Sequence, residues 1–508
     1  MEPFIHTFHG TSWIDRDLEK RLTTSWAFDV NRAGYWIKGL SQIGKTSLLQ
    51  RFGATNFTRV FIADLSNTDT RERLEFCFSQ ASMIHSGPGF ETRFADKVFK
   101  QCFPDFQNTA DELIIIDEIQ ESITIHNYAK FIVRELKAKI AFCGSFMGDL
   151  EWQLDLGGES IHFPIGDVAC FDAAPVTYRE FLSSLRSVER YNNALDFLGV
   201  KAADHEKEIL LSAKESFDLF FELGGFPKPL SLSETHAIDL SVAQDELFSV
   251  LNAQIDRMYE KTKEIKTGNV LALDDWRLLV GYITQAVILG KDPEDLSNLK
   301  LLPEQEQALG AILEETVVRL INWMVDSCVL AYMRVYDQNR RNSTTSQKLI
   351  FASCEMLRCY ASLCESVETA LAAKSLESEI FVYSELRSLI LLSKFKDISL
   401  PIRAYVRRDG NALIETAFAF NTKSGARVSL EVKAPSEKGI SGSQSLEVTG
   451  AEYSITFCEG LGHIHDKAIS IPMYHIDRLP AIIDIIDTAH ARHVSLEKSY
   501  ELHAQLQD

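Results

Sequence analysis

The chain has 508 residues, of which 45% are apolar and 24% are charged, a composition typical of folded proteins. No apolar run approaches the roughly 20 residues of a membrane span, and the N-terminus does not read as a secretory signal. The nine cysteines are scattered, so we expect a reduced, cytoplasmic protein of two to four domains. The net charge of −20 excludes nucleic-acid binding that depends on overall charge and leaves only a local basic patch.

The first motif predicts a phosphate-binding loop between a strand and a helix. Residues 35–38 (YWIK) are typical of a buried strand, and TSLLQRF can begin a helix. The stretch between them, GLSQIGKTSLL, fits the pattern GxxxxGK[ST]. Its glycines let backbone N–H groups face a triphosphate, Lys45 would reach the β- and γ-phosphates, and Thr46 would hold Mg²⁺. The predicted cofactors are therefore ATP and Mg²⁺. The predicted nucleotide-binding residues in the loop are Gly39, Ser41, Gln42, Ile43, Gly44, Lys45, Thr46 and Ser47.

A second motif, DELIIIDEIQ (111–120), predicts a central strand that ends in two acids. Such a strand ends at the ligand-binding edge of a parallel sheet. Asp117 is then placed to bind Mg²⁺ through its water shell. Glu118 is placed to polarise an attacking water, so Glu118 and Lys45 are the predicted catalytic residues.

The elements around these motifs alternate between strands and helices. Further strands are expected at 59–65, 139–146 and 161–165, with amphipathic helices such as 90–103 and 127–139 between them. This order predicts an α/β fold in which helices cover both faces of a parallel sheet. Ser145, near the end of the strand at 139–146, either senses the γ-phosphate or simply forms a strand-end turn.

The middle of the chain predicts a different arrangement. Residues 240–350 are mostly helical in pattern, and two short β-branched or aromatic runs then flank a polar turn, which is the plan of a winged helix. Arg340 and Arg341 lie in that turn. They are either a local DNA contact on an acidic protein or exposed residues that favour solubility.

These motifs together resemble the prokaryotic AAA-type, archaeal-ATPase-like P-loop proteins that carry a C-terminal domain of unknown function, number 4143. The family's GPRQVGKTTLL is similar to GLSQIGKTSLL, its apolar run ending in DEIQ to IIIDEIQ, and its PLSFREFL to APVTYREFL (174–182). The family's GGFP stands intact at 224–227, and looser similarities continue to SLEVK (429–433), so the resemblance covers nearly the whole chain. In related ATPases a proline at this place lies against the base, which implies that Pro227 helps to hold adenine.

The chain departs from the family at two arginines. Ser41 stands where the family commonly has an arginine in the loop, and Glu159 replaces the arginine of an AGR triplet. Glutamate cannot neutralise transition-state charge. The sequence offers Arg134 and Arg179 as substitutes and selects neither. The departures predict slow hydrolysis, or an arginine supplied by a protein partner or by self-association.

The resemblance also implies a C-terminal fold of the restriction-endonuclease type. Such a site holds Mg²⁺ with acids and a nearby lysine. Glu431 and Lys433 share one face of a predicted strand. Ala417 stands where the family has its central aspartate, and Glu415 lies two residues away, about 6.6 Å along a strand. We therefore predict a weak or inactive nuclease. Its candidate residues are Glu385 (with Glu379 as the other choice for the helical acid), Glu415, Glu431 and Lys433.

The predicted domains are an ATPase core (1–185), a helical lid with GGFP (186–240), a winged-helix-like domain (241–350) and a nuclease-like domain (351–508). The leading interpretation is an ATP-binding protein that acts as a slow ATPase or molecular switch, coupling nucleotide state to the later domains and to DNA. One alternative is an ATP-licensed, Mg²⁺-dependent nuclease effector. A second alternative is a non-enzymatic, nucleotide-binding scaffold that engages a protein partner.

Overall fold

The computed structural model divides the chain into two compact units. It describes residues 14–28, 34–84, 94–148, 167–184, 204–230, 240–264, 270–299, 301, 303, 310, 312–337, 346–364, 366–395, 402–409, 412–432, 446, 449–458 and 462–504. Unit 1 comprises Met1–Ala174, Ser249–Leu279 and Lys300–Val329, and unit 2 comprises Pro175–Phe248, Val280–Leu299 and Leu330–Asp508. Among the described helices, none has both the length and the apolar character needed to span a bilayer. The predicted division into four consecutive domains stays a prediction.

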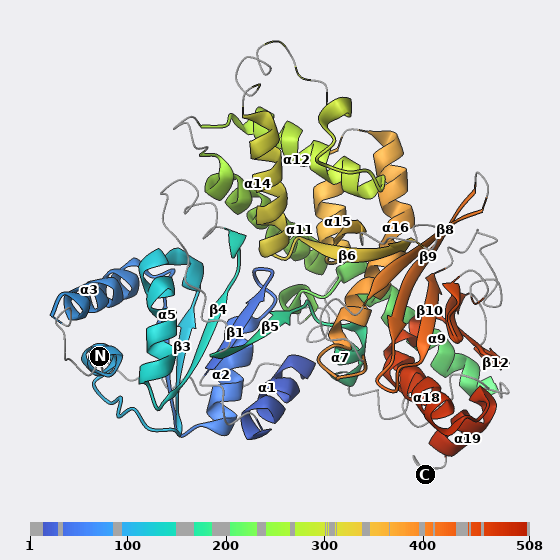
Figure 1. Cartoon of the computed structure of the whole chain (residues 1–508), viewed down its shortest axis with the longest axis horizontal. Coiled ribbons are helices and arrows are strands. Elements are labelled where there is room, and N and C mark those ends of the chain that lie inside the picture. Colours follow the sequence, from blue (N-terminus) through green and yellow to red (C-terminus); the bar gives the residue numbers. More distant parts are fainter. Residues whose placement is uncertain are drawn as a thin grey trace. The chain divides into compact units, whose positions relative to one another are not determined.

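Unit 1 is built around a five-stranded parallel sheet in the order β2-β3-β4-β1-β5 (Figure 1). Its elements are α1 (Asp17–Phe28), β1 (Gly34–Gly39), α2 (Lys45–Asn56), β2 (Arg59–Asp64), α3 (Thr68–Ile84), α4 (Phe94–Cys102), β3 (Glu112–Asp117), the 3-10 turn η1 (Ile119–Glu121), α5 (Ile123–Glu135), β4 (Lys139–Gly144), β5 (Val168–Ala173) and α14 (Leu313–Asp326), with parts of α11 (Leu240–Thr262) and α12 (Leu273–Ile288). The predicted α/β fold with a parallel sheet is thereby confirmed.

Four of the five predicted strands correspond to β1, β2, β3 and β4. The run at 161–165 lies outside the described residues. The fifth strand of the sheet is instead β5, which the sequence did not predict. β5 is an edge strand whose exposed Cys170 and Asp172 interrupt its apolar pattern, so it lacks the continuous apolar run that marked the central strands.

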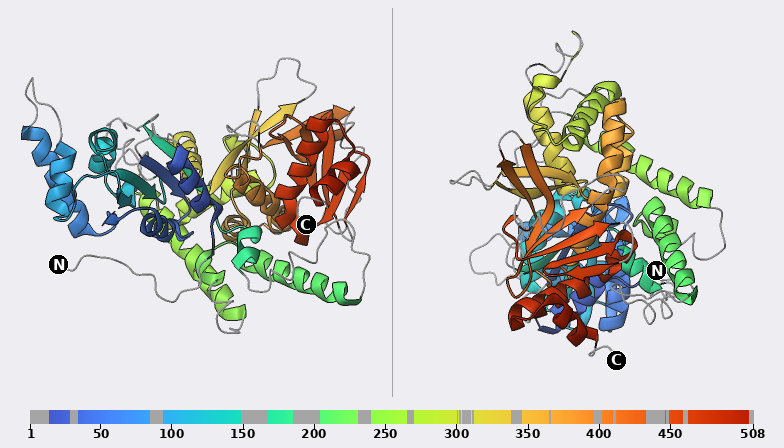
Figure 2. Two further views of the ribbon diagram at one scale, coloured as in Figure 1. Left: turned by 90° about the horizontal axis from the view of Figure 1, so that it is seen from below. Right: turned by 90° about the vertical axis from the view of Figure 1, so that its right-hand side faces the viewer.

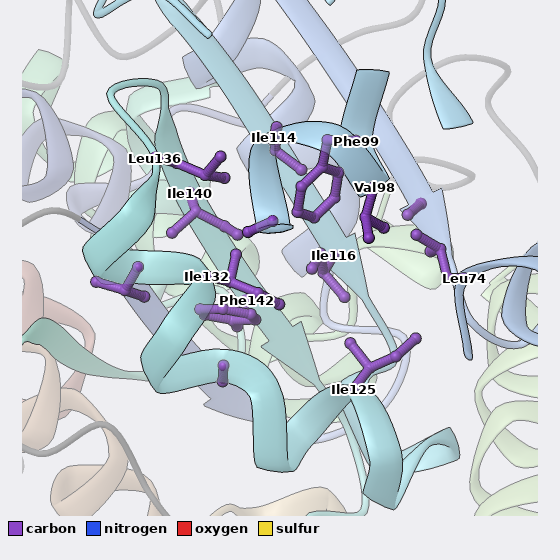
Figure 3. Close-up of a cluster of buried hydrophobic side chains, with 14 of the residues drawn as sticks. Leu74, Val98, Phe99, Ile114, Ile116, Ile125, Ile132, Leu136, Ile140 and Phe142 are labelled. Atoms are coloured by element: carbon purple, nitrogen blue, oxygen red, sulfur yellow. The ribbon is translucent and has the colours of Figure 1, made fainter. Parts of the chain in front are cut away.

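Alternation along the strands sends apolar side chains to both faces of the sheet. On one face Ile114, Ile116 and Phe142 pack with side chains of α3, α4 and α5, as Figure 3 shows. On the other face α2 buries Leu48 and Phe52. β3 is buried along its whole length, which explains its uninterrupted isoleucine run. This packing fixes the carboxyl ends of β1, β3 and β4 side by side.

Unit 2 contains an eight-stranded mixed sheet in the order β12-β13-β11-β10-β9-β8-β6-β7. Its elements are α7 (Tyr178–Ser184), α9 (Asp204–Leu223), η2 (Leu296–Asn298), β6 (Leu330–Asp337), β7 (Ser346–Phe351), α15 (Cys354–Ala361), α16 (Val367–Ser388), β8 (Arg403–Asp409), β9 (Ala412–Asn421), β10 (Arg427–Val432), β11 (Tyr453–Cys458), β12 (His463–His465), β13 (Ala468–Pro472), η3 (Met473–Arg478), α18 (Leu479–Arg492) and α19 (Leu496–Ala504), with the remainder of α11 and α12. Figure 2 shows its strands beside α18 and α19.

The two runs predicted after the helices form two antiparallel strands, β6 and β7, and the polar turn between them lies outside the described residues. β6 also pairs in parallel with β8, so the hairpin forms one edge of the eight-stranded sheet. The winged helix itself stays a prediction. The same holds for the restriction-endonuclease-like fold, although β10 does run parallel to β11 and antiparallel to β9 within this mixed sheet.

A buried histidine makes the stability of unit 1 depend on pH. His126 on α5 is 2% exposed and lies edge-on to Trp36, with ring centroids 5.3 Å apart. Burial lowers the pKa of His126 from its usual 6.5 to about 4, against an opposing hydrogen bond with Asn127. The stability that neutral His126 contributes is therefore fully present above pH 6.5 and is lost as the pH falls toward about 4.

We expect His126→Phe to remove this part of the acid sensitivity. Between about pH 7 and about pH 5, the free energy of unfolding of the wild type should fall by about 2 kcal/mol more than that of the variant. Urea unfolding at the two pH values measures the difference. The exposed His465 provides the control, and His465→Phe should leave the slope unchanged. Equal slopes for the wild type and His126→Phe would contradict the prediction.

Candidate functional site

The candidate site lies where β1 runs into α2. Gly39 ends the strand and Lys45 begins the helix, as the motif requires. Gln42 and Gly44 adopt positive φ angles of 62° and 85°, which turn the chain tightly between them. The N–H of Leu48 donates to the Gly44 carbonyl at 2.9 Å. The N–H groups of residues 45–47 precede that bond and lie at the positive end of the helix.

Lys45 is buried inside the loop. Its Nζ donates to the carbonyls of Gly39 (3.0 Å) and Leu40 (2.6 Å) and to the Ser145 hydroxyl (3.0 Å). Burial lowers the pKa of Lys45, and the nearby carboxylates of Glu118 and Asp117 oppose that shift. The ammonium group therefore depends on these oxygen acceptors and acidic neighbours to stay charged.

The carboxylate of Asp117, at the end of β3, accepts three hydrogen bonds. Thr46 Oγ1 donates to its Oδ2 at 2.6 Å, and the Cys143 thiol (2.7 Å) and the Glu118 N–H (3.0 Å) donate to its Oδ1. Burial raises the pKa of Asp117, while the bonds from Cys143 and Thr46 lower it. Thr46 and Asp117, the two predicted Mg²⁺ ligands, are therefore hydrogen-bonded to each other.

Glu118 lies within reach of Lys45 through one hydroxyl. Ser145 Oγ, which accepts from Lys45, donates to Glu118 Oε1 at 3.1 Å. Gln120 Nε2 donates to the other carboxylate oxygen of Glu118. Glu118 itself has a φ of 49°, an uncommon conformation for a residue other than glycine. Lys45, Ser145 and Glu118 therefore form one chain of hydrogen bonds.

Cys143 is a site residue that sequence reasoning missed. The parallel register of β3 and β4 places Ile116 opposite Phe142, which brings the next residues, Asp117 and Cys143, to the same edge. That register is the signal that could have found it. Burial raises the pKa of Cys143 well above its usual value, so the group acts as a neutral S–H donor to Asp117.

The residues present fit ATP and Mg²⁺. The Lys45 ammonium and the N–H groups of residues 45–47 face an anion, and Thr46 with Asp117 offers the oxygen ligands that Mg²⁺ prefers. Within the described residues, no cluster of three or more His, Cys, Asp or Glu side chains forms a preformed metal site. Mg²⁺ held by one or two protein oxygens and by substrate phosphates requires no such cluster.

Other predicted residues lie away from this network or in unit 2. Arg134 pairs with Asp167 at 3.0 Å, and its side chain is 59% exposed. Arg179 and Pro227 belong to unit 2, where the Val176 N–H donates to the Gly225 carbonyl at 2.8 Å. The contact of Pro227 with adenine stays a prediction. Arg340, Arg341 and Glu159 lie outside the described residues, and so the DNA contact also stays a prediction.

The predicted nuclease residues are only partly described. Glu385 on α16 accepts a hydrogen bond from the Tyr178 N–H at 2.7 Å, and burial raises its pKa to about 8. Glu431 lies half-buried on β10, and Glu415 pairs through its backbone with Val406 of β8. Lys433 lies outside the described residues. The nuclease site stays a prediction.

Comparison with known families decides what the first part of the chain resembles. Residues 31–182 match the family described as "AAA domain". Together with the parallel sheet, this match supports a P-loop AAA domain in this segment. ATP binding and hydrolysis are the activity that such a domain supports. No match is found among curated proteins.

Solved structures resemble the chain only distantly. The Walker-type ATPase PABY2304 of Pyrococcus abyssi is 15% identical, with a TM-score of 0.37, covering 70% of this chain and 99% of that one. The ADP form of the Aeropyrum pernix ORC2 protein is 12% identical, with a TM-score of 0.29, covering 73% and 96%. Drosophila ORC bound to DNA is 14% identical, with a TM-score of 0.22, covering 68% and 95%. Likenesses this distant carry no argument about function.

The hydrogen bond from Cys143 should matter for Mg²⁺. We expect Cys143→Ala to raise the Mg²⁺ concentration that half-saturates ATP binding by about tenfold, because Asp117 loses a donor to Oδ1. Cys143→Ser, which restores a donor, should stay within about threefold of the wild type. Titration of fluorescent ATP binding with Mg²⁺ measures this. The buried Cys77 gives a matched control, and Cys77→Ala should not move the midpoint.

Proposed function

We propose that this protein binds Mg²⁺·ATP at the β1–α2 loop and hydrolyses it slowly, as a molecular switch. The observation that carries the proposal is the connected network in which Lys45, Ser145 and Glu118 form one hydrogen-bonded chain, and Thr46 bonds to Asp117 beside it. These side chains come from two neighbouring strand ends and one helix, and they supply a phosphate ligand, Mg²⁺ ligands and a base for phosphoryl transfer to water.

Each residue of the network has a role in the proposed reaction. Lys45 would exchange its loop carbonyls for oxygens of the β- and γ-phosphates, and Thr46 with Asp117 would hold Mg²⁺. Bound with ATP, Mg²⁺ neutralises charge on the phosphates. Glu118 would take the proton of the attacking water. Ser145, which touches both Lys45 and Glu118, would report the γ-phosphate to the base.

We further propose that ATP hydrolysis is slow and that the nucleotide state is coupled to another part of the chain. Serine at position 41 leaves the loop without the arginine common in the family, which supports slow turnover. A switch also requires that another part of the chain responds differently to ATP and ADP. We propose the C-terminal part, including the domain of unknown function 4143 that the resemblance implies, as the responding part, and DNA as a ligand of the switch.

The central test separates binding from hydrolysis. Lys45→Ala should weaken binding of a fluorescent ATP analogue by roughly 10- to 100-fold, because it removes a charged hydrogen-bond donor. Glu118→Gln should keep ATP bound while lowering kcat by about a hundredfold or more, because the amide cannot accept the proton. Equilibrium titration and steady-state phosphate release measure the two. The exposed Lys100, paired with Asp96, gives the control Lys100→Ala.

The same measurements distinguish the alternatives. A scaffold would bind ATP and release no phosphate, and Glu118→Gln would then leave its function intact. A nuclease effector would cut DNA or RNA in the presence of Mg²⁺ and ATP and would lose that activity in Glu431→Ala. Wild-type protein that neither binds nor hydrolyses ATP would refute the proposed function.

A further inference from the structure

Helix α11 presents three polar residues to the ATP site. Gln254, Arg257 and Lys261 follow each other at helical spacing and therefore share one face. Gln254 Nε2 donates to the carbonyl of Ser41, 213 positions away in the sequence, at 3.2 Å. Arg257 pairs with Glu121, and Lys261 Nζ lies 3.2 Å from the same carboxylate. One helix thus contacts both the phosphate-binding loop and the turn that follows Glu118.

The side chain of Gln254 is suited to respond to a ligand. It is 3% exposed, and its Oε1 has no hydrogen-bond partner among the described residues. A buried polar atom without a partner is unfavourable and is rare in folded proteins. Its amide donates a hydrogen bond to the loop, which would change its own hydrogen bonds when Lys45 moves to phosphate. Gln254 is therefore tied to the position of the loop.

Arg257 acts on the segment directly after Ser145. Its guanidinium lies 4.8 Å from the centroid of the Phe146 ring, and the same ring stacks on Trp323 of α14 with centroids 5.8 Å apart. Phe146 has a φ of 38°, a strained value for a bulky residue. Arg257 and Trp323 therefore hold a backbone conformation that would not persist alone.

Arg257 consequently contacts two segments that position the hydrolytic base Glu118. Through Phe146 it fixes Ser145, which donates to Glu118, and through Glu121 it fixes the short turn η1 that begins directly after Glu118. The Glu121 N–H donates to the Glu118 carbonyl at 2.9 Å, which closes that turn. A displacement of Arg257 would therefore move Glu118 without touching ATP.

We propose that this face of α11 couples occupancy of the loop to the position of Glu118, with Arg257 as a positioning residue for hydrolysis. The inference rests on the proposed function and deepens it. This role differs from the one for which the sequence offered Arg134 and Arg179, which is to neutralise transition-state charge, because Arg257 acts through Phe146 and Glu121. Arginine suits the role because its planar guanidinium can stack on a ring and pair with a carboxylate at the same time, which lysine does less well.

The test compares ATP affinity with turnover. Arg257→Ala should leave the Kd of a fluorescent ATP analogue within about twofold, yet lower kcat by about ten- to a hundredfold, because the base is misplaced. Arg257→Lys and Phe146→Leu each remove only the stacking and should lose less. In the background of Glu118→Gln, Arg257→Ala should cause no further loss, because it acts through that base. Gln254→Ala should instead weaken binding by about threefold to tenfold.

Matched variants make the outcomes decisive. Arg73→Ala removes an exposed arginine of the same unit and should leave both constants within about twofold. If Arg257→Ala does not fold, as judged by thermal unfolding, Arg257→Lys and Phe146→Leu carry the test. An active wild type whose kcat is unchanged in the Arg257 variants overturns this inference and leaves the proposed function standing. A wild type that binds no ATP, or binds it without hydrolysis, overturns the hydrolytic proposal and this inference with it.

Discussion

The site depends on keeping a buried lysine charged. Taking an ammonium group out of water is unfavourable unless acceptors and opposite charges replace its hydration. Lys45 finds them in two loop carbonyls, in the Ser145 hydroxyl and in the acidic pair at the end of β3. All of these groups stand at the carboxyl ends of β1, β3 and β4. The strand order β3-β4-β1 is therefore a requirement of the site as well as a feature of the fold.

The parts of the fold that the sequence predicted are those with a local signal. The isoleucine run of β3 and the glycine-rich loop can each be recognised from about a dozen consecutive residues. The parallel sheet follows from the order in which strands and helices alternate. The edge strand β5 carries a broken apolar pattern and escaped prediction. The pairing of β6 with β8 joins segments on either side of α15 and α16, so no local pattern indicates it. The contact of Gln254 with Ser41 was unpredictable for the same reason.

Two motifs on which the family resemblance rests contribute buried N–H groups to unit 2: Tyr178 of the motif at 174–182 and Gly225 of GGFP. Their partners include Glu385, which the sequence assigned to a nuclease site. The N–H groups of Tyr178 and Gly225 are buried donors, and Glu385 and Glu355 accept from them. Gly224 has a φ of +72° and lies so close to Glu355 that a Cβ there would collide with it. Since burial raises the pKa of Glu385 to about 8, its carboxyl is largely protonated at neutral pH. Glu385 serves here as the acceptor of the Tyr178 N–H, and a nuclease role for it stays a prediction.

The polarity of the phosphate-binding loop follows from what binds its carbonyls. Gln254 donates to the carbonyl of Ser41, and the buried Arg16 donates to that of Ile43 at 3.0 Å while also reaching the carbonyl of Ala174 at 2.6 Å. These two donors, from α11 and from a preceding segment, turn the carbonyls of Ser41 and Ile43 toward the protein and do not depend on Lys45. Because a peptide group points its N–H away from its C=O, the same arrangement leaves N–H groups to face an anion. A loop with serine at position 41 can in this way still present N–H groups to an anion, because Gln254 and Arg16 hold its carbonyls on the opposite side.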